Sequence, residues 1–391
     1  MRKAIEQLPG SRIREVANAG MGRSDVLAFW FGESDEVTPE AVRAAAADSL
    51  ARGETFYAHN LGMAELREAL ASYTSALHGA VSIDRIAVTS SGVSALMLAT
   101  QMLVGAGDEV VAVVPVWPNL TAQPAIMGAN VVRVALVPRD GAWALDLDKL
   151  LAAITPATRM LLVNAPNNPT GWTLTRAEQQ AILDRCRKTG TWIVADEVYE
   201  RLWFGEGVRG EPGANGCAPS FLDIANDKDR LIVVHSFSKS FLMTGWRLGW
   251  MVLPDGHLDA VGKLIEFNTS CAPVFVQRGG LAGLQTAQTT VPELAARMKA
   301  CRDRLVGGLR QLPGVQLGNP LGGMYAFFRV PGASDDSLAF AKHLVTEHGL
   351  GLAPGVAFGD EAQGWLRWCF ASRDPSRLDQ GLARLASALR L

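Results

Sequence analysis

The chain has 391 residues, 48% of them hydrophobic and 19% charged, with 37 Lys and Arg against 39 Asp and Glu. This composition supplies a large apolar core and excludes a disordered chain or a small disulfide-stapled scaffold. A formal net charge of −2 offers no broad basic field to nucleic-acid phosphates or anionic lipid, so we expect a small-molecule partner, with no nucleic acid and no membrane.

The five cysteines show no CxxC spacing and the six histidines no metal-binding spacing, so we predict neither a disulfide framework nor a metal site. The first residues contain no apolar stretch of signal-peptide length. No later run reaches the roughly 18 apolar residues of a membrane span. A cytoplasmic protein is therefore expected.

Near the start of the chain, Thr38 and Pro39 predict the cap and first position of an Ala-rich helix that Gly53 ends. The next helix is marked by apolar residues along one face, namely Leu66, Leu70, Tyr73 and Leu77. These two helices precede the first predicted strand.

Short β-branched runs then alternate with helical patterns, as βαβ units require. The predicted strands are 86–89, 110–114, 131–134, 160–163, 192–195, 231–234 and 248–252. Ser91 and Gly92 start a helix over 94–103, and Thr175 with Glu178 forms a capping box for a helix closed by Gly190. Helical connections favour parallel pairing, so we expect an α/β fold with a mainly parallel seven-stranded sheet flanked by helices.

After about residue 285 the pattern changes to that of a smaller α+β domain. It comprises a long helical stretch to Leu312, a strand at 324–329, a helix near 337–348 and a strand at 365–369. Residues 1–41 are too few to fold alone and are expected to pack against it. We therefore predict a large domain over 42–285 and a small domain built from 1–41 and 286–391. The Gly- and Pro-rich stretch 205–219 is typical of a surface loop.

Four polar motifs lie in or just after the ends of predicted strands, where ligands bind in open α/β sheets. They are 164–171 (NAPNNPTG), 196–199 (DEVY), 236–239 (SFSK) and, eight residues later, Arg247. In this order and spacing they resemble the fold-type-I, class I and II aminotransferases. The resemblance extends from Gly32 and Glu33 to Arg367. It implies the cofactor pyridoxal 5'-phosphate, amino-acid and 2-oxo-acid substrates, and a homodimer.

Lys239 follows a strand among three serines, so a partly enclosed amine with a lowered pKa is expected instead of the common surface lysine. The resemblance makes it the Schiff-base lysine, which also carries the proton between substrate and cofactor. Two carboxylates, Asp196 and Glu197, compete for the next role. Asp196 finishes an apolar strand, where a buried acid needs a cation, and the protonated ring nitrogen of the cofactor would supply one.

Other cofactor contacts follow from the resemblance. Tyr199 and Asn168 match the donors to the cofactor's phenolic oxygen, although a packed tyrosine and a turn asparagine are the plain alternatives. The remaining matches are Ser91, Gly92 and Val93 at a helix start, Ser236 and Arg247 for the phosphate, Trp117 stacked on the ring, and Tyr57 reaching the phosphate from the neighbouring subunit. A core tyrosine is the alternative for Tyr57, and a core or surface position the alternative for Trp117.

Arg367 lies in an alternating strand, where a lone arginine among apolar residues needs an anionic partner. The resemblance assigns it to the substrate's α-carboxylate, with Gly32 and Asn168 assisting; a surface charge on an edge strand is the alternative. No second substrate-binding arginine is assigned. Phe29, Trp30 and Phe31 could favour an apolar or aromatic substrate, yet such runs are more often buried strands.

The predicted activity is transfer of the amino group of an α-amino acid to a 2-oxo acid by ping-pong kinetics, with Lys239, Asp196 and Tyr199 as the catalytic residues. A carbon–sulfur β-lyase using the same cofactor is the enzymatic alternative, because the same fold serves both chemistries. A non-catalytic pyridoxal-phosphate-binding regulator is a further alternative, which would require a DNA-binding domain.

Overall fold

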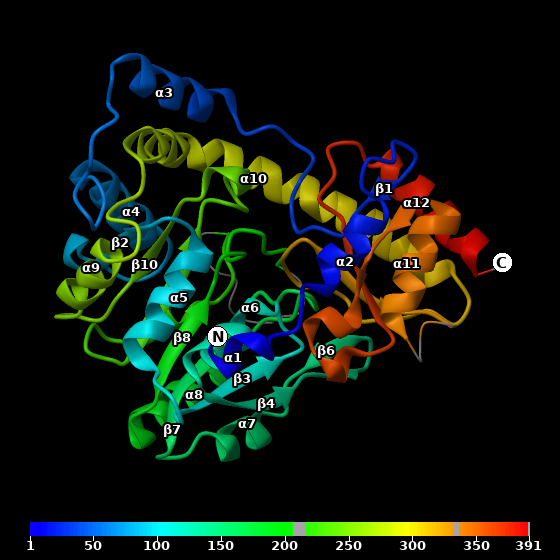
Figure 1. Cartoon of the computed structure of the whole chain (residues 1–391), viewed down its shortest axis with the longest axis horizontal. Helices are drawn as coiled ribbons and strands as arrows, with labels where there is room; N and C mark the ends of the chain where they lie inside the picture. Colours follow the sequence, from blue (N-terminus) through cyan, green and yellow to red (C-terminus); the bar gives the residue numbers. More distant parts are fainter. Residues whose placement is uncertain (206–215, 332, 334–335, 390–391) are drawn as a thin grey trace.

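The computed structural model describes residues 1–205, 216–331, 333 and 336–389. Within them, a seven-stranded sheet covered by helices lies beside a smaller part built on a four-stranded sheet (Figure 1). The long helix α10, Val274–Gln311, joins the two parts. It packs on α3 (Glu40–Ala51), α4 (Ala64–Leu77) and α12 (Ser376–Ala388). The stretch 206–215 of the predicted loop lies outside the described residues.

The strands of the large sheet follow the order β2-β10-β9-β8-β7-β3-β4. Strand β10 is antiparallel to both neighbours and the other four pairs are parallel, which confirms the predicted mainly parallel sheet. The carboxyl ends of β2, β9, β8, β7 and β3 therefore share one edge. The strands are β2 (Ile86–Thr89), β3 (Glu109–Val114), β4 (Asn130–Ala135), β7 (Thr158–Asn164), β8 (Trp192–Asp196), β9 (Leu231–Ser236) and β10 (Gly249–Val252).

Alternate residues of the central strands enter two separate apolar clusters, one on each face of this sheet. Val111 and Ile193 belong to one cluster, and Val110 and Val194 to the other. Both faces are buried under helices, which explains why the strands are continuous apolar runs. The first face packs on α4, α7 (Leu147–Ala153), α8 (Arg176–Thr189) and α10; the second packs on α5 (Gly92–Leu103), α6 (Asn119–Met127) and α9 (Leu258–Glu266).

Helix capping follows the sequence signals with one exception. The Thr175 side chain accepts from Glu178 in the predicted capping box of α8, and Gly190 ends that helix with φ +74°. Helix α3, in contrast, begins at Glu40, one residue later than predicted, and Thr38 does not cap it. The Thr38 hydroxyl instead donates to the Leu242 carbonyl at 2.6 Å, a contact 204 residues away along the chain.

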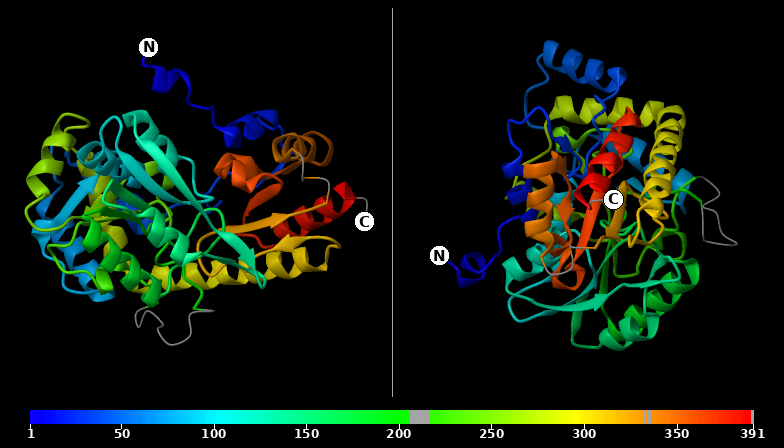
Figure 2. Two further views of the ribbon diagram at one scale, coloured as in Figure 1. Left: turned by 90° about the horizontal axis from the view of Figure 1, so that it is seen from below. Right: turned by 90° about the vertical axis from the view of Figure 1, so that its right-hand side faces the viewer.

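The smaller part contains an antiparallel sheet in the order β11-β12-β15-β14. Strand β1 pairs in parallel with β13 and α2 packs on α11, so the N-terminal segment (blue) lies against the C-terminal part (Figure 2). Residue 285 lies inside α10, and the domain limits of the sequence analysis stay predictions. The strands are β1 (Leu27–Ala28), β11 (Gln316–Leu317), β12 (Tyr325–Arg329), β13 (Leu350–Gly351), β14 (Ala353–Pro354) and β15 (Trp365–Cys369).

The remaining elements are short helices and one hairpin. The α-helices are α1 (Lys3–Glu6), α2 (Arg12–Ala19) and α11 (Ser337–His348), and the hairpin is β5 (Val137–Arg139) with β6 (Ala142–Ala144). The 3-10 helices are η1 (Ile83–Arg85), η2 (Phe221–Asp223), η3 (Thr244–Trp246), η4 (Gly355–Phe358) and η5 (Asp360–Ala362). Among the described residues, no helix combines the length and apolarity that crossing a membrane requires.

Candidate active site

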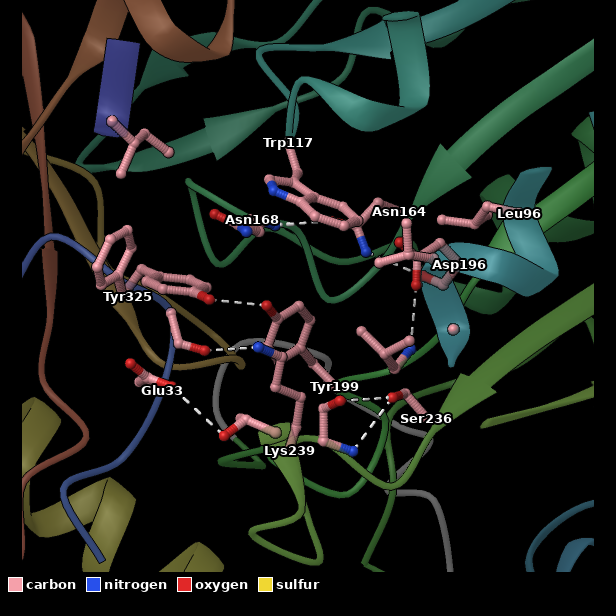
Figure 3. A pocket seen from close by; sticks show the side chains of 18 of the residues that line it. Glu33, Leu96, Trp117, Asn164, Asn168, Asp196, Tyr199, Ser236, Lys239 and Tyr325 are labelled. Carbon is pink, nitrogen blue, oxygen red and sulfur yellow. Dashed lines mark hydrogen bonds between the residues drawn. The ribbon is translucent and has the colours of Figure 1, made fainter. Parts of the chain in front are cut away.

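A cavity of about 420 Å³ lies where the carboxyl ends of β7, β8 and β9 meet the N-terminal segment and the smaller part (Figure 3). Its volume is typical of small-molecule sites. Most of the predicted site residues line it together: Gly32, Gly92, Val93, Trp117, Asn168, Asp196, Tyr199, Ser236, Lys239, Arg247 and Arg367. Ser91 and Tyr57 do not line the cavity.

Lys239 lies in the turn that follows β9 and extends its amine into the cavity. Its Nζ donates to the Gly32 carbonyl at 2.5 Å and lies 5.6 Å from the centre of the Tyr199 ring. Burial lowers the pKa of Lys239 to about 8. No carboxylate among the described residues is hydrogen-bonded to this amine, and a pKa of about 8 leaves roughly one amine in ten neutral and nucleophilic at pH 7.

Asp196, and not Glu197, is the carboxylate of the cavity. Asp196 is the last residue of β8, is buried, and accepts a long hydrogen bond from the Val198 amide at 3.4 Å. Burial raises the pKa of Asp196 to about 7. Glu197 does not line the cavity and accepts instead from the Ser220 hydroxyl at 2.5 Å and the Phe221 amide at 3.2 Å. Successive residues at the strand end thus face different surroundings.

The raised pKa of Asp196 predicts how stability without cofactor depends on pH. The folded protein holds this proton more tightly than the unfolded chain. The contribution of this proton to the unfolding free energy is therefore fully present below about pH 4 and is lost as pH rises through about 7. Between pH 5 and 8, the cofactor-free protein should lose a few kcal/mol more unfolding free energy than its Asp196→Asn variant. Urea unfolding at both pH values measures the difference, and equal losses in the two proteins would contradict the prediction.

Two asparagines link the cavity walls. The Asn168 amide donates to Asn164 Oδ1 at 2.7 Å, and Asn164 Nδ2 donates to the Asp196 carbonyl at 3.0 Å. Trp117 is tied to the same turn, because its amide donates to the Asn168 carbonyl at 2.8 Å. Asn164 lines the cavity but was not singled out from the sequence. Its position as the last residue of an apolar strand, the same position as that of Asp196, was the available signal.

Arg367 is a buried cation without a carboxylate partner among the described residues. It is 2% exposed in β15, an interior strand of the small sheet, so the alternative of a surface charge on an edge strand is wrong. Its Nη1 donates to Asn168 Oδ1 at 3.1 Å and its Nη2 to the Trp30 carbonyl, while its Nε has no partner in the described part of the chain. The guanidinium lies 4.4 Å from the ring centre of Tyr325. A buried arginine in this state favours an incoming anion.

Tyr325 is a site residue that sequence reasoning missed. Its hydroxyl lies 2.7 Å from that of Tyr199 (Figure 3). A Cβ atom at Gly32 would come within 2.0 Å of the same hydroxyl, so only glycine fits at position 32 without displacing Tyr325. Burial raises the pKa of both tyrosines, which therefore stay protonated donors at neutral pH. No motif marks Tyr325, because its partner Tyr199 is 126 residues away.

A strained turn opens α5 onto the cavity. Ser91 has φ 137° and ψ 164°, a region occupied essentially only by glycine, and its side chain accepts from the Ser94 amide at 3.1 Å. Gly92 and Val93 follow at the cavity wall, and a Cβ at Gly92 would lie 3.1 Å from Ser236 Cβ. Ser91 therefore shapes the turn, while its neighbours present the helix N-terminus, an anion-binding feature, to the cavity.

Arg247 brings a positive charge to the same end of the cavity. It adopts a left-handed backbone conformation, φ 55° and ψ 56°, directly after η3. Its Nη1 donates to the Thr244 carbonyl at 2.6 Å, and no carboxylate pairs with it among the described residues. Ser236, which also lines the cavity, accepts from the Ser238 amide at 3.1 Å. The helix start, the hydroxyl and the guanidinium together suit a phosphate group.

Comparisons with known proteins agree with this geometry. The model of the aminotransferase class I and II family matches residues 25–385. An aspartate aminotransferase of Pyrococcus horikoshii is 30% identical over 97% of this chain and 94% of its own length. An arginine–pyruvate transaminase of Pseudomonas aeruginosa is 32% identical over 90% and 87%. A single-mutant aspartate aminotransferase structure from Thermus thermophilus superposes with a TM-score of 0.89, at 31% identity and 99% coverage of both chains.

The chain belongs to the class I and II aminotransferase family. Both the predicted fold and the predicted aminotransferase activity are thereby confirmed. Neither the β-lyase nor the non-catalytic regulator receives support from these relatives.

Proposed function

We propose that this aminotransferase uses pyridoxal phosphate in the described cavity to move the amino group of an α-amino acid to a 2-oxo acid by ping-pong kinetics. One observation carries the proposal. Lys239, Asp196 and Arg367 converge on the cavity, yet none is hydrogen-bonded to an oppositely charged side chain among the described residues. Buried charges are normally paired, so their partners are expected to arrive with the cofactor and substrate.

The cavity residues fit the cofactor group by group. Asp196 would receive the protonated ring nitrogen, since burial without a cationic partner is what raises its pKa. The helix start at Gly92 and Val93, with Ser236 and Arg247, would hold the phosphate. Trp117 supplies an aromatic face, and Tyr199 and Asn168 supply donors for the phenolic oxygen. When bound, pyridoxal phosphate supplies an aldehyde that reacts with amines and a ring that takes up electron density from the substrate.

The chain's own residues would then bind the substrate and move its proton. Arg367 binds the α-carboxylate as a planar, bidentate donor; its Nη1 already donates to Asn168. The guanidinium carbon of Arg367 lies 4.4 and 4.9 Å from the ring centres of Tyr325 and Phe358, and these contacts hold the guanidinium in place for the carboxylate. Lys239 Nζ, with its pKa lowered to about 8, is suited both to accept a proton from the substrate's α-carbon and to return one.

An amino-acid panel tests the proposal directly. The purified protein supplied with pyridoxal phosphate should convert one amino acid stoichiometrically to its 2-oxo acid when no acceptor is present, with a matching change in cofactor absorbance. Adding a 2-oxo acid should reverse the change and release a new amino acid. Release of pyruvate and ammonia from cystathionine without any acceptor would favour the β-lyase alternative. A protein that never takes up the cofactor would overturn the proposal.

A second copy of the chain is proposed to complete the phosphate site through Tyr57. This side chain is 88% exposed and lies outside the cavity of its own chain, so the core-tyrosine alternative is wrong. Phe56 and Phe267 are also exposed, at 84% and 90%, and exposed large apolar groups are typical of interaction surfaces. Sedimentation that showed only a monomer at micromolar concentration would contradict the dimer.

A further inference from the structure

A buried ionic network lies behind the wall of the cavity and has no place in the mechanism above. At its centre is His78, which follows α4 and has a side chain only 1% exposed. Its Nδ1 lies 2.8 Å from Asp223 Oδ1, and its Nε2 lies 2.9 Å from Glu200 Oε2. Glu200 continues the network, because its other oxygen lies 3.5 Å from His235 Nδ1.

This geometry defines the charge of His78. A carboxylate oxygen can only accept a hydrogen bond. Each of the two ring nitrogens of His78 lies at hydrogen-bond distance from one carboxylate, so both nitrogens must donate. Only the imidazolium cation carries protons on both nitrogens. Burial alone would lower the pKa of His78, but the hydrogen bonds that the ring donates to Asp223 and Glu200 outweigh it and raise the pKa to about 10.

The groups that face His78 come from several elements. Across the network lie Glu197 and His235; Arg176 is 3.2 Å from Asp223, and Arg201 donates to the Tyr73 hydroxyl. Three of these side chains, Glu197, Glu200 and His235, lie close enough together to surround a metal ion in principle. Protein donors already reach both glutamates, and the His78 cation already supplies a positive charge there.

The network is attached to the turn that carries the catalytic side chains. Within the segment 196–200, Asp196 and Tyr199 line the cavity, while Glu197 and Glu200 face the network. The turn is closed by the Glu200 amide, which donates to the Glu197 carbonyl at 3.0 Å. On the next strand, His235 precedes Ser236 of the cavity and stacks on Trp250 with ring centres 4.8 Å apart. A change in Glu200 would therefore reach both cavity side chains of the turn.

We propose that His78, donating to Glu200 and Asp223, is a positioning residue that holds the 196–200 turn and adds a buried positive charge behind the cofactor site. The inference rests on the proposed function, since it concerns how Asp196 and Tyr199 are presented to the cofactor. His78 does not line the cavity. It acts through Glu200, by fixing the backbone from which Tyr199 projects, and through its charge, by favouring deprotonated forms of groups in the cavity.

The charge state of His78 can be measured on the wild-type protein, with variants serving only to identify its signals. In the cofactor-free protein labelled with ¹⁵N-histidine, the His78 signals, identified by their loss in His78→Asn, should show protons on both ring nitrogens at pH 8. A single protonated nitrogen at that pH would overturn the proposal. If His78→Asn does not fold, selective loss in Glu200→Gln or Asp223→Asn identifies the same signals.

The positioning role is tested by the pH at which the absorbance of the bound cofactor changes. In His78→Asn this midpoint should rise by about one pH unit, because a buried cation and a fixed Tyr199 donor are both lost. In Asp223→Asn, which removes an anion, it should fall or stay unchanged. The matched control is His343→Asn, a change at an exposed position on α11, which should leave the midpoint where it is.

Kinetics separate positioning from general damage. His78→Asn should lower kcat about tenfold or more while KM for the amino acid changes less than about threefold, because Arg367 is untouched. A His78→Asn protein with the wild-type absorbance midpoint and the wild-type kcat would overturn the proposal. An upward shift of the midpoint in Asp223→Asn as large as that in His78→Asn would also overturn it. Failure of the proposed function is distinguishable, because the wild-type protein would then neither bind the cofactor nor transaminate.

Discussion

Replacing Lys239 by alanine is expected to lower kcat by at least about 10⁴-fold, the largest loss of any single change considered for this enzyme. Nζ of Lys239 is the amine placed in the cavity beside Asp196 and Tyr199, and burial lowers its pKa to about 8. Under the proposed function, the variant would lose both the covalent attachment point for the cofactor and the group that carries the substrate's proton. Among the described residues, no other lysine lines the cavity that could replace it.

Two measurements check the expected loss. Steady-state transamination gives kcat, and mass spectrometry after borohydride reduction shows whether the cofactor is joined to the peptide that contains residue 239. Lys149→Ala, at an exposed position on α7, is the matched control and should keep both activity and adduct. A Lys239→Ala protein that turns over normally, or an adduct on another residue, would remove the proposed mechanism.

Replacing Asp196 by asparagine is expected to lower kcat by at least about 10²-fold. Asparagine keeps the shape of the side chain but cannot carry the negative charge that, under the proposed function, would hold a proton on the cofactor's ring nitrogen. Breaking a buried ion pair by removing one partner costs about 3 kcal/mol or more, which corresponds to that factor. Because Asp196 is buried at the end of β8, water cannot substitute for the lost charge.

Glu197→Gln is the matched control for this prediction, since it removes a carboxylate from the adjacent residue. Glu197 faces Ser220 and Phe221 and does not line the cavity, so its loss should cost far less than that of Asp196. Single-turnover rates with a saturating amino acid give the comparison free of product release. Equal losses in the two variants would mean that the charge at position 196 has no particular role.

Several parts of the fold were predictable because they depend on local sequence. The seven strands of the large sheet fall where β-branched runs stand, and the capping box of α8 joins residues only three apart in the chain. The start of α3 was not predictable in the same way. Thr38 is a residue type that commonly caps helices, but its hydroxyl donates to the carbonyl of Leu242, which is distant in sequence.

The same division applies to the cavity. The order and spacing of the four motifs marked Lys239, Asp196 and Arg247, because each motif is defined by its neighbours in the chain. Tyr325 and the His78 network carried no such signal. Their partners are 126 and 122 residues away, and a side chain's role there depends on which element packs beside it.

The sequence by itself therefore determined the mainly parallel sheet, the family and most of the residues around the cavity, since periodicity and strand-end position are properties of short segments. Only the tertiary structure decided that Arg367 is enclosed in an interior strand and that His78 is held between two acids. The physical reason is that burial and charge pairing depend on contacts between distant segments, which local patterns do not encode.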